Sequence, residues 1–163
     1  LAELMAFGRG NDALGERIHN LVRRLVGARS AAATVEAIET SLREDFGLRQ
    51  AVLVLFGDHP ALKAAESRFL RLVPRETPEL KTFDSLFASG KPRCGQVRDS
   101  QRDFLFGAGA VDVGSAALVP LGANGALGIL ACGSTDAEHF NPSMSTDYLA
   151  RIADLLAVAL TAS

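Results

Sequence analysis

The sequence lacks the excess of basic residues that a dedicated nucleic-acid-binding protein needs. It has 17 Lys and Arg residues against 19 Asp and Glu residues, which gives a formal net charge of −2. We therefore expect no nucleic-acid partner. Long apolar runs are missing as well. Stretches such as 51–56 and 116–132 are too short, or too interrupted by Pro and Gly, to cross a bilayer, which takes about 20 helical residues. We expect no membrane partner either.

Cysteine is scarce, since only Cys94 and Cys132 occur in 163 residues. They lie far apart and each is followed by Gly, so the sequence has no C-x-x-C pair and no zinc-knuckle spacing. The histidines have no partner four residues away, and we expect neither a metal nor a cofactor. Scarce cysteine is typical of a reducing cytoplasm. The start at Leu1 has no basic leader and indicates the interior of a longer chain rather than a signal peptide.

The overall composition is that of one globular domain. Hydrophobic residues make up 48% of the chain and charged residues 22%. A chain of this length buries enough surface to hold a core without disulfides or structural metal. The start and the end of the chain have helical apolar spacing, and the middle is rich in strand-like runs.

A heptad pattern predicts a helix from Leu1 to Ala28 with one apolar seam. Asn11 falls at an a position, where an amide costs stability but pairs well with its own copy, so the pattern favours a parallel homodimer in register. Three glycines weaken the helix. The alternative is an amphipathic helix that lies on its own domain. The residues expected at the dimer interface are Leu4, Phe7, Asn11, Leu14, Ile18, Leu21 and Leu25.

Two further helices and four strands are expected downstream. Ser30 is a suitable N-cap for a helix from Ala31 to Phe46, and Gly47 is a suitable residue to end it. Helical spacing predicts a closing helix from Ser143 to Thr161. The expected strands, two of which form a hairpin across an Asn-Gly turn, are Ala51–Phe56, Phe69–Val73, Ser115–Leu121 and Ala126–Cys132.

Helices at both ends of a strand-rich middle predict an α+β domain, with the helices on one face of an antiparallel sheet. The other face needs a cover. The irregular segment Pro74–Gly114 can supply it, since it holds four of the 9 phenylalanines.

Several segments resemble GAF domains, which are small sensory modules. Gly114–Leu121 and Ala126–Gly133, joined by a Gly-rich turn, are similar to the late strands of such domains. Ser89–Gly95, Asp103–Gly107 and the final helix resemble a GAF-like bacterial family catalogued as domain of unknown function 484. The family is similar in having a long helix ahead of the GAF-like part.

The heptad pattern and the resemblance together predict a heptad helix at 1–29 and a GAF-like domain at 30–163. The resemblance implies an α+β fold with a sheet of about six antiparallel strands, terminal helices on one face and irregular loops with short helices on the other. It also implies dimerisation through the helices and a hollow of ligand size under the cover. The motifs for cyclic nucleotides and bilins do not occur in this chain.

We expect a ligand under the cover to meet the residues Phe87, Arg93, Cys94, Phe104, Phe106 and Ser115. The phenylalanines would wall the hollow, Arg93 would pair with a carboxylate or phosphate, and Ser115 would donate a hydrogen bond. The same phenylalanines would serve equally well in a solid core, so an occupied pocket and a filled core both stay open.

The interpretation is a non-enzymatic, GAF-like signalling module that forms a homodimer, with a small molecule and an unidentified protein as candidate partners. Two alternatives remain. Cys94 follows Lys91 and Arg93 in the sequence. These basic residues would lower a thiol pKa at an exposed site and suit a thiol redox enzyme of the methionine sulfoxide reductase kind. A ligandless dimerisation scaffold is the other.

Overall fold

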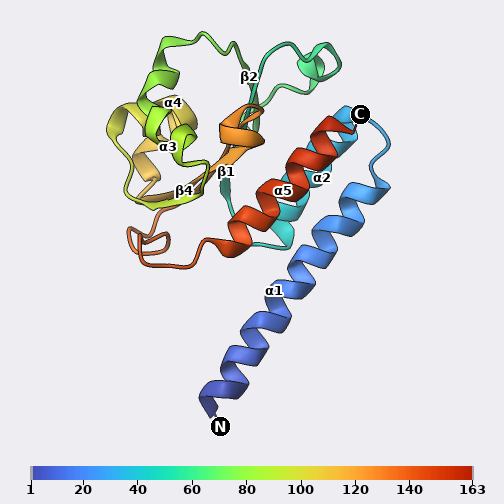
Figure 1. The fold of residues 1–163 in the computed structure, drawn as a ribbon, viewed down its shortest axis with the longest axis vertical. Helices are drawn as coiled ribbons and strands as arrows, with labels where there is room; N and C mark the ends of the chain where they lie inside the picture. The colour runs from blue at the N-terminus through green and yellow to red at the C-terminus, as the bar shows by residue number, and fades with distance from the viewer. Residues whose placement is uncertain (1, 163) are drawn as a thin grey trace.

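The computed structural model describes residues 2–162, and describes side chains from Ala13 onward. It is an α+β fold in three layers, with a sheet between helices on both sides (Figure 1). The α+β class is therefore confirmed. The helices are α1 (Ala2–Gly27), α2 (Ala31–Glu44), α3 (Asp84–Ser89), α4 (Asp99–Phe106) and α5 (Asp147–Thr161), and the strands are β1 (Gln50–Phe56), β2 (Leu70–Val73), β3 (Arg93–Gly95), β4 (Ser115–Leu121) and β5 (Gly128–Ser134).

The sheet differs from the expected one in strand number and in one pairing. It has five strands in the order β2-β1-β5-β4-β3. The pair β1–β2 is parallel, with Leu53 opposite Leu70, and the other pairs are antiparallel. The segment between β1 and β2 explains this difference. It includes the 3-10 helix Pro60–Ala65 and is long enough for the crossover that parallel neighbours require, so β2 does not form a hairpin with β1.

The predicted hairpin forms between β4 and β5, with Leu121 opposite Gly128. Asn124 has the positive φ of 52° that its place in the turn predicted. Gly128 has a φ of +155°, and a Cβ there would lie 1.9 Å from the carbonyl oxygen of Val54 on β1. Only glycine lets β5 approach β1 so closely, and β5 is the central strand of the sheet.

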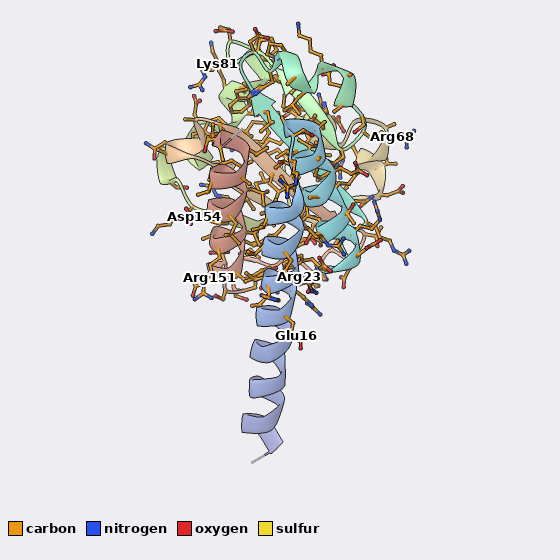
Figure 2. The ribbon with its side chains drawn as sticks, turned by 90° about the vertical axis from the view of Figure 1, so that its right-hand side faces the viewer. Glu16, Arg23, Arg68, Lys81, Arg151 and Asp154 are labelled. Atoms are coloured by element: carbon orange, nitrogen blue, oxygen red, sulfur yellow. The ribbon has the colours of Figure 1, made fainter. Side chains whose placement is uncertain are left out.

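Helices α1, α2 and α5 lie together on one face of the sheet (Figures 1 and 2). Ser30 caps α2 as predicted, since its Oγ accepts a hydrogen bond from the backbone N–H of Ala33 at 3.1 Å. Leu21 of α1, Ile38 of α2 and Leu156 of α5 are fully buried and share one core with alternate residues of the sheet. The C-terminal half of α1 therefore belongs to the body of the protein.

The remaining residues of the heptad seam fall into two groups. Leu14, Ile18 and Leu25 are partly buried. Leu4, Phe7 and Asn11 lie outside the residues whose side chains are described. The backbone of α1 is helical through this region, and its N-terminal part extends past the body (Figure 1). Because Leu21 is covered completely by its own chain, it has no surface left for a partner.

The segment between β2 and β4 covers the opposite face of the sheet, as predicted. It contributes α3, α4 and two 3-10 helices, Pro78–Phe83 and Gly107–Asp112. Phe83, Leu86 and Leu105 from this cover are buried against Val54 and Ile129 of the sheet. A second core thus lies under the cover.

Candidate functional site

The centre of the cover is filled with side chains. Phe83 has no exposed surface, and its ring centroid lies 6.4 Å from that of Phe87 and 6.0 Å from that of Phe104. Phe87 also meets Phe56 of β1 edge to face at 5.9 Å. These contacts are those of a packed aromatic core.

A cleft remains where the cover meets the edge of the sheet. It has a volume of about 510 Å³ and lies between the start of β1, the edge strand β2 and the end of α4 with the 3-10 turn after it. Such a volume is in the range of small-molecule sites, about 300–1,000 Å³. We call it the edge cleft. The residues that line it are Arg49, Gln50, Ala51, Val52, Arg68, Arg71, Asp103, Phe104, Leu105, Phe106, Gly107, Ala108 and Gly109.

Arg71 is fixed against one wall of the edge cleft. It stands opposite Val54 in the β1–β2 ladder, and its Nη1 donates to the carbonyl oxygens of Phe104 and, at 3.2 Å, Leu105. Its guanidinium carbon lies 5.0 Å from the centroid of the Phe104 ring. Carbonyls at the end of a helix carry partial negative charge and aromatic faces attract cations, so this arginine is held in place on both sides.

Gln50 contributes an unusual polar group to the same cleft. Its Oε1 is buried and accepts no hydrogen bond from any described residue. A buried carbonyl without a donor costs stability, on the order of 1–3 kcal/mol. The wall of the edge cleft therefore contains a hydrogen-bond acceptor that no described residue satisfies.

The structure separates the six residues expected around a ligand. Phe104 and Phe106 line the edge cleft. Phe87 packs in the filled centre of the cover, and the exposed Arg93 donates from Nη1 to Ser85 Oγ at 3.0 Å. Cys94 and Ser115 lie elsewhere, so only two of the six residues share the cleft.

Ser115 holds two segments of its own chain together. Its buried Oγ donates to the carbonyl oxygen of Asp136 at 2.6 Å and accepts from the backbone N–H of Phe140 at 3.1 Å. The hydroxyl hydrogen is thus already used in the loop that follows β5. The expected donor to a ligand here secures that loop.

The two cysteines lie on the helix side of the sheet and on alternate strands. Cys94 stands opposite Ala117 of β4, and Ala117 stands opposite Cys132 of β5. Two strand spacings put their Cα atoms about 9.5 Å apart, whereas a disulfide requires no more than about 7 Å. Burial raises the pKa of both thiols, that of Cys132 to about 12. The pair has neither the contact nor the acidity that thiol exchange requires.

Sequence reasoning missed four polar residues that line the edge cleft. Arg49 and Gln50 come just before and at the start of β1, and Arg68 and Arg71 flank the start of β2. Because the two strands run in parallel, their first residues meet at one end of the sheet. The sequence does show a basic residue before each of two expected strands, Arg49 before 51–56 and Arg68 before 69–73. The expected antiparallel sheet, however, would have placed these two residues at opposite ends of the strand pair.

Within the part of the chain that the structure describes, no three His, Cys, Asp or Glu side chains are grouped so that they could hold a metal ion. No helix in residues 2–162 has the length and apolar character to span a membrane.

Almost the whole chain matches a protein family. The family is described as "Protein of unknown function, DUF484", and the match covers residues 1–162. The chain belongs to this family. No curated protein matches it. The family has no assigned activity, and the function has to be argued from the edge cleft and from α1.

Proposed function

We propose that this member of the DUF484 family is a non-enzymatic, GAF-like regulatory module of the cytoplasm. It forms a homodimer through the N-terminal part of α1 and binds a small molecule in the edge cleft. A protein partner of unknown identity would receive the signal through α1.

The course of α1 is the main support. The helix has 26 residues, and its N-terminal part extends past the body (Figure 1). The apolar seam of α1 includes Leu21, which is buried in the core, and extends from there toward the N-terminus as far as Leu4. A lone helix of about 12 residues is barely stable in water, so an apolar seam on this part favours a partner helix. Asn11 in the seam favours a second copy in register.

A short route connects the edge cleft with α1. Arg24 of α1 is paired with Asp45 just after α2, and the chain reaches Arg49 at the cleft four residues later. A ligand that fixes Arg49 and Gln50 would favour one position of this connection and of α1 with it. Ligand binding and the packing of α1 would then be coupled in both directions.

Light scattering tests the dimer. Phe7→Asp places two carboxylates opposite each other in the seam, and we expect it to halve the mass of the particle. The matched control is Arg9→Asp, two residues away at an f position of the heptad and thus outside the seam. Phe7 suits this test better than Ile18, which is partly buried in its own chain. An unchanged mass for Phe7→Asp contradicts the proposed dimer.

A thermal-shift screen with small metabolites tests the ligand. A compound that raises the melting temperature of the wild type should fail to do so in Ala108→Trp, because the exposed Ala108 lines the edge cleft and an indole would fill it. Ala64→Trp, at an exposed position of the 3-10 helix before β2, is the control and should keep the shift. A shift that survives in Ala108→Trp places the ligand elsewhere.

Two other functions remain as outcomes of these tests. A dimer for which no compound gives a shift is a ligandless scaffold. A thiol redox enzyme would lose peroxide or sulfoxide turnover in Cys94→Ser, although the separate positions of Cys94 and Cys132 speak against it.

A further inference from the structure

We propose that the ligand of the edge cleft is a small organic anion, with a carboxylate or phosphate group held by Arg49 and Arg68 and an apolar part lying on Phe104 and Phe106. The inference rests on the proposed function, because it takes the edge cleft as the ligand site. It adds the chemical class of the ligand and the residues that would select it.

The charge of the edge cleft is the first argument. Three arginines, Arg49, Arg68 and Arg71, line it together with a single carboxylate, Asp103. Yet the chain as a whole has a formal net charge of −2. None of these arginines forms an ion pair with a carboxylate of the described residues. Asp103 offsets one of these three charges, so the lining keeps an excess of positive charge, which favours an anion there.

The chemistry of arginine is the second argument. A guanidinium presents a planar fork of N–H donors that matches the oxygen atoms of a carboxylate or phosphate. Arg71 is already oriented, because both of its hydrogen bonds to α4 use Nη1 and its plane lies near Phe104. Arg49 and Arg68 are exposed at the mouth of the cleft, and Figure 2 shows Arg68 at the rim of the molecule. They are positioned to make the first contact with an incoming anion.

The apolar lining is the third argument, because it excludes a bare inorganic ion as the best ligand. Val52 is buried at the base of the cleft, and Phe104 and Phe106 are partly buried in its wall. A volume of about 510 Å³ has room for an organic group beside the anion. Gln50 Oε1 also lacks a donor, which a hydroxyl or amino group on the ligand could supply once the side chain turns toward it.

Four probes of similar size test the class of ligand: benzoate, phenyl phosphate, neutral benzamide and cationic benzylamine. Each is titrated into the full chain, labelled with ¹⁵N, and the amide shifts of Gln50, Val52 and Phe106 are followed. We expect both anions to bind about tenfold more tightly than benzamide, and benzylamine not to bind. The relative affinity of benzoate and phenyl phosphate identifies which anionic group the site prefers.

The variant for this experiment is the double substitution Arg49→Gln and Arg68→Gln. Both residues are exposed, so the fold should be retained, and the affinity for the anions should fall about tenfold. The matched control is Arg43→Gln with Arg151→Gln, which removes the same charge from exposed sites on α2 and α5. This control should leave the affinity close to that of the wild type.

Several results would overturn the inference. One is that benzamide or benzylamine binds as tightly as benzoate. Another is that the double cleft variant keeps its affinity for the anions. The third is that no probe binds in the cleft. A neutral metabolite whose thermal shift is lost in Ala108→Trp would refute the anionic class and leave the proposed function standing. Anion binding that survives in Ala108→Trp would refute the site itself.

Discussion

Arg24 and Asp45 join α1 to the end of α2. Arg24 Nε donates to Asp45 Oδ2 at 2.9 Å, and Ser41 Oγ donates to the same oxygen at 2.8 Å. The Asp45 side chain is only 8% exposed. A carboxylate so enclosed needs both donors. It lies between α2 and β1, on the route that we propose between α1 and the edge cleft.

Asp45→Asn should destabilise the protein at neutral pH. Burial by itself would raise the pKa of Asp45, but hydrogen bonds from Arg24 and Ser41 outweigh it and the pKa lies below its ordinary value. The stability that this carboxylate provides is therefore present above its unfolded pKa of about 3.9 and is lost as the pH falls through its folded pKa. We expect a loss of about 1 kcal/mol at pH 7 in urea denaturation.

The pH dependence distinguishes this ion pair from simple packing. The difference between wild type and Asp45→Asn should shrink as the pH falls from about 4 toward the folded-state pKa, because the unfolded wild-type chain takes up its proton before the folded one does. Glu44→Gln is the control, because Glu44 contacts the same arginine at 3.1 Å but its side chain is 54% exposed. It should change stability little. A difference that is as large in acid as at pH 7 contradicts the electrostatic explanation.

Ser115→Ala should destabilise the loop after β5. The substitution leaves the carbonyl of Asp136 and the N–H of Phe140 without the partner that they have at 2.6 and 3.1 Å. We expect a loss of about 1–3 kcal/mol and faster amide exchange at Phe140. Ser134→Ala, which removes a single contact to the Asp136 N–H at 3.1 Å on the exposed side of the same loop, should cost less. Equal losses of stability in Ser115→Ala and Ser134→Ala would show that the burial of the Ser115 hydroxyl adds nothing to the strength of its hydrogen bonds.

The thiols should react slowly in the native protein. Burial raises the pKa of Cys132 to about 12 and also raises that of Cys94, so both are protonated at neutral pH. Iodoacetamide should modify Cys132 only after addition of guanidinium, as measured by mass spectrometry. Cys94, at 7% exposure on the short strand β3, should react somewhat sooner through local opening. Rapid labelling of native Cys94 would restore the redox alternative.

Most of the fold could be predicted from local signals. Ser30 caps the start of α2 because capping depends on a few adjacent residues, and the Asn124 turn joins β4 to β5 for the same reason. The helix ends at Glu44 with Asp45 as its C-cap, two residues before the expected end at Phe46, and Gly47 follows with a positive φ of 67°. The parallel pairing of β1 with β2 could not be predicted. Local sequence does not determine which neighbour a strand pairs with or in which direction. Here the crossover through Pro60–Ala65 brings β2 alongside β1 in the parallel direction.

The candidate site was harder to predict, because it depends on that pairing. Phe104 and Phe106 were named from composition alone and do line the cleft. Arg49 and Arg71 come together only when β1 and β2 run side by side in the same direction. Cys94 was assigned to the wrong side of the sheet, since the face of a strand follows from register and one residue reverses it.

Gly128→Ala should be far more damaging than a glycine substitution at an open position of the chain. Its Cβ would lie 1.9 Å from Val54 O, so β1 and β5 would have to separate in the middle of the sheet. We expect a loss of more than about 3 kcal/mol, or failure to fold. Gly15→Ala in α1 is the control, because nothing lies within 4 Å of its added methyl. It should stabilise the helix by up to about 1 kcal/mol, and a destabilised Gly15→Ala would mean that this turn of α1 has a partner.

Gln50→Met should make the unliganded protein more stable and weaken its ligand binding. Methionine fills a similar volume and removes a buried Oε1 that has no donor among the described residues, so we expect the melting temperature to rise by about 3 °C. If Gln50 turns toward the ligand, the affinity for the preferred anion should fall in the same variant. Such a result is expected where a binding site keeps a polar group that destabilises the free protein. The exposed Gln96 serves for comparison, and Gln96→Met should alter neither property. A lower melting temperature for Gln50→Met would show that the carboxamide is hydrogen-bonded in the free protein.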